Sequence, residues 1–339
     1  MPTPPEVLFH RYFQTLSPVD RKKYRGKKDL DRLQQPTVQS LLVRIQEEFN
    51  EALRNEKKNV PEHVEHPPFH FDYIDSSTPN ALAFRYEGYS FIGITIALIE
   101  TLWDVCFQLS RSQAVATRLA VSLSPGEYDK LHVVLFRTQL NFVVSHEYTH
   151  HVHGHVARGS ASVATNEILD EGETGNLERQ ILEADADGYA AYHVLANLID
   201  GEYRTQAITL LNLEAEQPTV QDEALFGCFV VAIGGYLFVR PPHDLDSTIV
   251  YGFTHPPQAV RMACLMDQAI RWCGQKRPAL AGWMTIDRFQ TLMRSAAEAT
   301  WGMNGGRDWA AQAAFLLSEE GTKYRGKLNE GIRGYIQSL

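Results

Sequence analysis

Two histidines and a glutamate near the middle of the chain have a spacing that could support metal chemistry. Residues 145–150 have the sequence SHEYTH, in which Glu147 follows His146 directly and His150 comes four positions after His146. On a helix, residues four apart lie on the same face, so both imidazoles can bind one metal ion. Glu147 can then reach a water molecule on that ion and act as a general base. Two ligands and one base on one helix are the arrangement found in zinc-dependent hydrolases with this motif.

The HExxH motif alone does not establish a metal site. At ordinary residue frequencies, it arises by chance in a chain of this length about one time in a hundred. A catalytic zinc site has three protein ligands and one open position, so a third ligand must come from elsewhere. His151 would point about 100° away from His150 around a helix. We interpret His153 and His155 as helix-end or loop residues, with an accessory metal site as the alternative.

The best third ligand lies in the segment LEADADGYAA, residues 182–191. Glu183 and Asp187 are four positions apart, so they share one helix face. Glu183 can complete the site, and Asp187 can accept a hydrogen bond from the outward ring nitrogen of a ligand histidine. Alternatively, both are solvated carboxylates of an acidic stretch. The flanking alanines favour burial, where acids need partners.

Composition and charge narrow the function classes. The chain has 339 residues, enough for one large domain or two modest ones. It carries 32 Lys and Arg against 41 Asp and Glu, and this net charge of −9 argues against a nucleic-acid partner. The four cysteines form no CxxC pair and the N-terminal residues show no signal-peptide pattern, so we expect a cytoplasmic protein.

One uncharged apolar stretch, Leu225 to Val239, raises the question of a membrane. It is shorter than the ~20 residues that span a bilayer. We therefore predict a buried core helix at this position and no membrane span, with membrane association as the alternative.

Hydrophobic periodicity predicts a mainly helical protein with a small β-sheet, an α+β fold. Residues 69–95 are rich in β-branched and aromatic residues and predict two or three strands, the last two joined as a hairpin across Glu87-Gly88. One helix is expected from about Ala97 to Leu119. A second is expected from Ser124-Pro125 through HEYTH to a stop at Gly154. The polar residues 156–177 would form a lid or a surface insertion.

We divide the chain into three parts. Residues 1–66 form an N-terminal helical region, residues 67–275 a catalytic domain, and residues 276–339 a C-terminal helical region. The pentapeptide KYRGK occurs at residues 23–27 and again at residues 323–327, but five residues are too few to indicate a repeat.

Four short motifs, in order, resemble one branch of the gluzincin metallopeptidases, the branch with the CAAX-prenyl and heat-shock membrane zinc endopeptidases. HEYTHHVHGH followed by EADADGYA resembles its HExxH, a glycine-histidine pair one turn later, and ExxAD. Upstream, NALAF (80–84) and FIGIT (91–95) look like its substrate strand and that strand's hairpin partner. Downstream, THPP (254–257) and Arg261 are similar to its HPP…R signature. The resemblance implies a zincin-like fold, in which the HExxH helix packs against a second, ligand-bearing helix and a short substrate-binding β-hairpin.

The resemblance and the residues imply the same activity, a zinc-dependent endopeptidase that hydrolyses a protein or peptide substrate. One Zn²⁺ ion would be held by His146, His150 and Glu183. Glu147 would take a proton from the attacking water and pass it to the leaving amine.

The resemblance also assigns supporting residues. His255, on a turn stiffened by two prolines, would stabilise the developing oxyanion. Arg261 would brace the site through Asp187. Backbone groups of the substrate strand would pair with an extended peptide. That strand comprises Asn80, Ala81, Leu82 and Ala83.

The chain departs from the membrane enzymes of that branch because it shows no clear transmembrane helices. Only the hydrolysis of a peptide bond therefore carries over, and not a prenylated or membrane substrate. More loosely, its size and the apolar helix before HEYTH resemble the Lit-type phage-exclusion peptidases, which cut one host protein on a trigger. Two alternatives stay open: a triggered single-substrate protease, and a non-hydrolytic metal-dependent regulator or interaction protein. No feature specifies an oligomeric state.

Overall fold

The computed structural model describes residues 3–32, 36–59, 67–119, 121, 123–158, 176–240, 245 and 250–337. The chain divides into two compact units that are each discontinuous in sequence. The first comprises Met1–Glu100 and His150–Leu169, and the second Thr101–Thr149 and Asp170–Leu339. Helices α4 (Ile96–Arg111) and α6 (Tyr128–Val152) each continue from one unit into the other. The three-part division made from the sequence stays a prediction.

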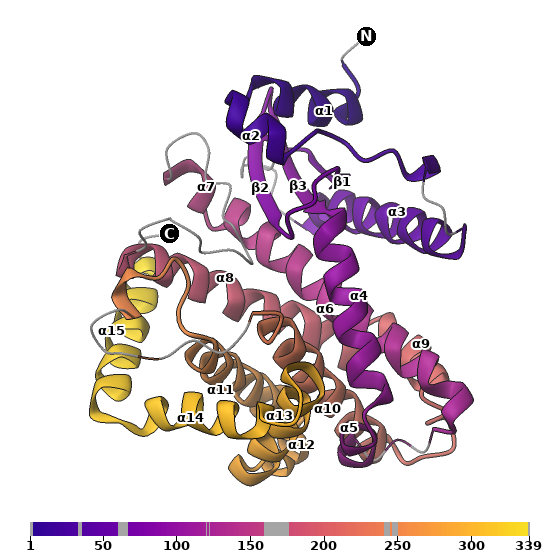
Figure 1. Ribbon diagram of the computed structural model, residues 1–339, viewed down its shortest axis with the longest axis vertical. Coiled ribbons are helices and arrows are strands. Elements are labelled where there is room, and N and C mark those ends of the chain that lie inside the picture. Colours follow the sequence, from indigo (N-terminus) through magenta and orange to yellow (C-terminus); the bar gives the residue numbers. More distant parts are fainter. Residues whose placement is uncertain are drawn as a thin grey trace. The chain divides into compact units, whose positions relative to one another are not determined.

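The first unit contains a three-stranded sheet in the order β1-β3-β2 (Figure 1). Its strands are β1 (Phe69–Ile74), β2 (Ala81–Tyr86) and β3 (Tyr89–Thr95). β2 and β3 are antiparallel, whereas β1 runs parallel to β3. Glu87 and Gly88 join β2 to β3 with φ angles of 45° and 81°, as a tight hairpin turn requires. The predicted hairpin is confirmed.

Helices from the N-terminal residues cover both faces of this sheet. Successive strand residues point to opposite faces. On one face, the ring of His70 lies 6.2 Å from that of Phe9 of α1 (Pro5–Thr15). On the other, the ring of Phe71 lies 5.3 Å from that of Phe49 of α3 (Pro36–Asn59). The short helix α2 (Pro18–Lys23) follows α1.

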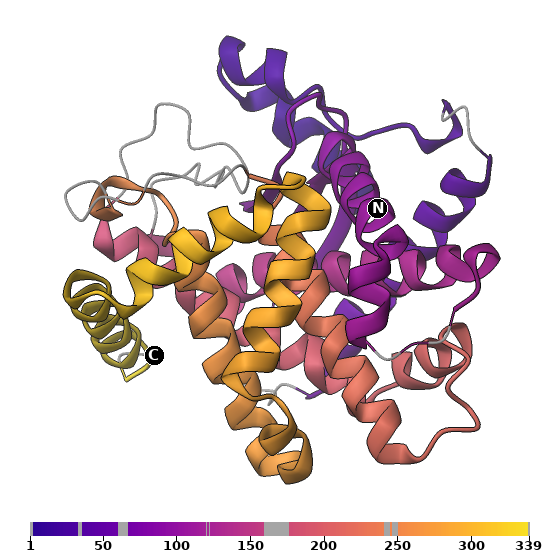
Figure 2. The ribbon, with the colours of Figure 1, turned by 60° about the horizontal axis from the view of Figure 1, so that its bottom comes forward.

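The described residues of the second unit are mainly helical, in agreement with the predicted fold class. Its further helices are α5 (Gln113–Leu119), α8 (Leu177–Leu195), α9 (Tyr203–Leu210), α10 (Pro218–Leu237), α11 (Gln258–Lys276), α12 (Pro278–Trp283), α13 (Ile286–Trp301), α14 (Gly305–Leu317) and α15 (Glu319–Ile336). α13 and α14 lie side by side (Figures 1 and 2), where a side chain on Gly305 would collide with the backbone of Ala297.

The helix predicted from Ala97 to Leu119 is two helices, α4 and α5. Ser112 separates them, because its side-chain oxygen accepts a hydrogen bond from the backbone N–H of Val115 at 3.4 Å and begins a new helix. The apolar periodicity of the sequence continues across Ser112, so this periodicity alone does not reveal where the first helix ends.

α10 is a core helix of the second unit. Every residue from Leu225 to Leu237 is buried, and a Cβ on Gly235 would lie only 2.5 Å from the side chain of Leu109 on α4. Within the part of the chain that the structure describes, α10 is the one helix long and apolar enough to cross a membrane. Of the 18-residue apolar stretch that meets this criterion, 83% is buried inside the protein. The predicted buried helix is confirmed.

The predicted metal-binding helix is also confirmed. A short 3-10 turn, Pro125–Glu127, leads into α6, and Gly154 follows its end with a φ of 74°. α7 (His155–Arg158) comes next, so residues 156–158 are helical and not part of a polar loop. Residues 159–175 of the predicted loop lie outside the described residues, and its last residue, Leu177, begins α8. Asn176 caps α8 by accepting a hydrogen bond from Arg179 N at 2.8 Å.

Candidate metal centre

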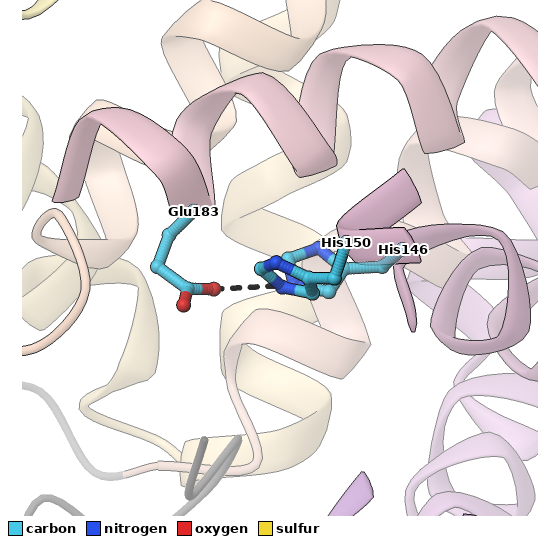
Figure 3. A group of neighbouring side chains, drawn as sticks. All are labelled: His146, His150 and Glu183. Carbon is cyan, nitrogen blue, oxygen red and sulfur yellow. Dashed lines mark hydrogen bonds and ion pairs between the residues drawn. The ribbon is translucent and has the colours of Figure 1, made fainter. Parts of the chain in front are cut away.

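Three buried side chains bring possible metal ligands together. His146 and His150 lie one turn apart because α6 continues unbroken to Val152. One ligand atom from each histidine and one carboxylate oxygen of Glu183 all lie within 4.8 Å of one another. Figure 3 shows both imidazoles facing the carboxylate, which α8 supplies. The structure therefore groups the two helix ligands with the acid that the sequence predicted as the third.

The chemistry of this donor set fits zinc. Two imidazole nitrogens and one carboxylate oxygen leave one position open in a tetrahedral site. With bonds of about 2.1 Å, two ligand atoms on one tetrahedral zinc lie about 3.4 Å apart. His146 Nε2 and Glu183 Oε2 are 3.1 Å apart. This pair is thus already near the separation that a shared zinc ion would set.

Asp187 connects His146 to an arginine. It lies one turn after Glu183 on α8, and its Oδ1 is 3.0 Å from His146 Nδ1. Arg261 of α11 donates to Oδ2 from Nε and to Oδ1 from Nη2, each at 2.8 Å. Burial raises the pKa of Asp187, but Arg261 and then His146 outweigh burial, so the pKa is lowered overall. An ionised Asp187 favours a proton on His146 Nδ1 and leaves Nε2 for a metal.

His255 lies beside the same glutamate. Its Nε2 is 3.3 Å from Glu183 Oε2, and its Nδ1 is 3.0 Å from the hydroxyl oxygen of Thr254. Pro256 and Pro257 follow, and α11 begins at Gln258. The structure therefore brings His255 to the candidate metal centre, as it does Asp187 and Arg261.

Glu147 lies on α6, and Ala81, Leu82 and Ala83 of the predicted substrate strand lie in β2. Glu147 is fully buried on α6, directly after His146. Asn80 O accepts a hydrogen bond from Thr95 N at 2.9 Å, and Asn80 N donates to Thr95 Oγ1 at 2.8 Å. The backbone groups of Asn80 thus face β3, so those of the alternate residues Ala81 and Ala83 face away from it. Leu82 lies between these two residues in β2, which among the described residues is an edge strand.

The other histidines of the HEYTHHVHGH segment have separate contacts. His151 Nε2 lies 2.9 Å from Phe91 O, and burial lowers the pKa of His151 to about 3, so its ring is neutral. His155 Nδ1 lies 2.8 Å from His150 Nδ1, a contact with a candidate ligand that the helix-end interpretation missed. The accessory metal site at His153 and His155 stays an untested alternative.

Sequence reasoning also missed Gln180. It is completely buried one turn before Glu183 on α8. Residues 180, 183 and 187 lie on one face of a helix because they are three and four positions apart. This spacing is the signal in the sequence that could have placed Gln180 beside Glu183 and Asp187.

The model of Peptidase family M48 matches residues 43–269, which contain both candidate ligand helices and the segment through Arg261. The comparisons with curated proteins and with solved structures found no match.

Proposed function

Because the chain belongs to Peptidase family M48, it is a zinc-dependent metallopeptidase that acts on protein substrates, and we propose that one zinc ion is held by His146, His150 and Glu183. The family match confirms the predicted gluzincin relationship and supports the predicted metallopeptidase class. The observation that carries the ligand assignment is the buried group of three ligand atoms, with Asp187 against the outer nitrogen of His146.

Glu147 is the general base and acid of the proposed mechanism. When bound, zinc supplies a Lewis acid that makes water a stronger nucleophile at neutral pH. Glu147 takes the proton of the attacking water and passes it to the leaving amine. Its complete burial, next to the first ligand on α6, supports this role, because a carboxylate shielded from bulk water can transfer a proton within the site.

His255 stabilises the oxyanion in this mechanism. Its Nε2 lies 3.3 Å from Glu183 Oε2, so a donor is available beside the third ligand. Its other ring nitrogen contacts Thr254, which orients the ring. Arg261 keeps Asp187 ionised, and Asp187 in turn orients His146.

The substrate is an extended segment of a protein, and it adds to the edge of the sheet at β2. The outward backbone groups of Ala81 and Ala83 would make the ladder hydrogen bonds. Support comes from the strand order, which leaves β2 with β3 as its one partner strand among the described residues.

Metal removal tests the proposed activity. Cleavage of a fluorescence-quenched peptide library should be lost with 1,10-phenanthroline and recovered with added zinc. Glu183→Gln should lower zinc occupancy because it removes an anionic ligand, whereas Glu178→Gln, in the first turn of the same helix, should not. Unchanged zinc occupancy in Glu183→Gln contradicts the ligand assignment. Zinc binding without cleavage of any peptide would instead favour a triggered single-substrate protease.

We also propose that the protein acts in the cytoplasm. All four cysteines are free, and burial raises the pKa of Cys228 and Cys273 to about 12. Protonated, unpaired thiols suit a reducing compartment. Cell fractionation tests this location, and recovery of the protein from an oxidising compartment would contradict it.

A further inference from the structure

Gln180 connects residues 250–253, the segment before His255, to the C-terminal helix α15. Its side-chain Nε2 donates to Val250 O at 2.8 Å and to Phe253 O at 2.7 Å. Its Oε1 accepts a hydrogen bond from the hydroxyl of Tyr324 on α15 at 2.6 Å. Both hydrogens of one buried amide are therefore used on the backbone that leads to His255, and the orientation of the amide is set by Tyr324.

α15 contacts the same segment a second time. The ring of Tyr251, between the two carbonyls held by Gln180, lies 5.3 Å from the ring of Tyr324. The ammonium of Lys327, one turn along α15, lies 4.8 Å from the centre of the Tyr251 ring. Burial, followed by the nearby Cys264 and Tyr251, raises the pKa of Tyr324 well above its usual value. Tyr324 thus stays protonated and remains a hydrogen-bond donor at any working pH.

These contacts fix His255 relative to Glu183. Phe253 O, held by Gln180, belongs to the residue just before Thr254. After His255, two prolines lead into α11, which is held at Asp187 through Arg261. His255 is therefore restrained from both sides. The upstream restraint originates on α8, one turn from Glu183, so a shift of the Gln180 amide would move His255 Nε2 away from its 3.3 Å contact with Glu183.

We propose that Gln180 and Tyr324 are positioning residues for His255, and that α15 controls the efficiency of hydrolysis through them. The inference deepens the proposed function and rests on it. Neither residue is assigned to substrate or metal. Tyr324 lies beyond residues 43–269, the part of the chain that matches the family. The proposed effect on hydrolysis therefore comes from the C-terminal region of this chain.

The proposal gives the second KYRGK pentapeptide, residues 323–327, a specific use. Its tyrosine and its last lysine both contact the ring of Tyr251, in the segment before His255. In the first copy, residues 23–27, the hydroxyl of Tyr24 likewise meets a side-chain amide, accepting from Asn80 Nδ2 at 2.9 Å. Each copy thus places a buried tyrosine hydroxyl against a side-chain amide, that of Asn80 in the first copy and that of Gln180 in the second.

Hydrogen exchange tests the restraint without a substrate. Tyr324→Phe removes one hydroxyl and preserves the ring against Tyr251. Tyr335→Phe removes a hydroxyl from another buried tyrosine of the same helix and is the matched control. Exchange measured by mass spectrometry should rise over residues 250–257 in Tyr324→Phe and stay at the wild-type level in Tyr335→Phe. Wild-type exchange in Tyr324→Phe would overturn the proposal.

Kinetics on the peptide library test whether the restraint acts through His255. Loss of an oxyanion donor costs about 10²–10³ in kcat, so a displaced donor should cost about tenfold, with KM unchanged. Tyr324→Phe should lower kcat by this factor in the wild-type background and have no effect in a His255→Gln background. An equal loss in both backgrounds would mean a general structural role and would overturn the proposal.

Gln180→Met, of similar volume but without a donor, should reproduce the Tyr324→Phe kinetics with a larger loss. Zinc content should be unchanged in both variants, because neither residue contacts a ligand atom in the proposed site. If Gln180→Met does not fold, the kinetics and hydrogen exchange of Tyr324→Phe alone test whether α15 positions His255. If the wild type binds zinc but cleaves no library peptide, a triggered single-substrate protease is favoured, and the exchange experiment still decides whether Tyr324 restrains residues 250–257.

Discussion

Asparagine in place of Asp187 separates two contributions of this carboxylate to the site. In the wild type, Asp187 accepts two hydrogen bonds of 2.8 Å from Arg261 and lies 3.0 Å from His146 Nδ1. The side chains of Arg261 and Asp187 are only 5% and 2% exposed. Asp187→Asn keeps the size of the side chain but removes its charge. Both the arginine and the ligand histidine then lose their ionic partner.

The two effects have different magnitudes. Leaving one partner of a buried ion pair uncompensated costs about 3–5 kcal/mol of the free energy of unfolding. Loss of the group that orients a ligand histidine weakens metal binding about 10–100-fold. The first effect is present in zinc-free protein, whereas the second is measured only with zinc.

Urea unfolding of the zinc-free protein and zinc titration against a competing chelator measure the two effects separately. Arg261→Met in the Asp187→Asn background should recover part of the lost stability, because it removes the unpaired charge. It should not recover zinc affinity, since His146 still lacks a carboxylate. Wild-type stability together with wild-type zinc affinity in Asp187→Asn would refute the assigned role of Asp187.

Three further outcomes test other parts of the structure. Gly235→Ala should lower the free energy of urea unfolding by about 1–3 kcal/mol, because the new Cβ would lie 2.5 Å from a neighbouring side chain. Hydrogen bonds, led by that from Asn212, lower the pKa of Glu127 from 4.5 to about 2. This carboxylate therefore stabilises the fold above pH 4.5 and loses that effect as the pH falls towards 2. The free energy of urea unfolding should thus fall less steeply with decreasing pH, between 4.5 and 2, in Glu127→Gln than in the wild type. Ala83→Pro removes an outward N–H and no ladder bond, so it should raise KM for peptides and leave zinc content unchanged.

The local part of the metal centre was predictable from the sequence. The helical spacing of His146 and His150 places both on one face whatever the tertiary structure, and the spacing of Glu183 and Asp187 does the same on α8. Their burial followed from the flanking small residues. The fold class and the β2–β3 hairpin likewise depend on short-range patterns, namely periodicity and the Glu87-Gly88 turn.

Other contacts depend on tertiary structure and were not visible in local patterns. His255 and Arg261 were indicated by their resemblance to a family signature, because no spacing rule connects Arg261 to Asp187, 74 positions earlier. Gln180 and Tyr324 are 144 positions apart. No motif marked Gln180, and the recurring KYRGK pentapeptide that contains Tyr324 did not indicate a partner for it. The division of the helix at Ser112 was missed because a single hydroxyl that caps a new helix outweighs a continuous apolar pattern.

Zinc content and cleavage rate of Glu147→Gln, measured on the same sample beside the wild type, test the central claim most directly. Glutamine keeps the size of this buried side chain but cannot take a proton. The proposed mechanism predicts wild-type zinc content and a rate of peptide cleavage lower by about 10²–10⁴, the usual contribution of a general base. A zinc-loaded Glu147→Gln protein that cleaves at the wild-type rate would contradict it.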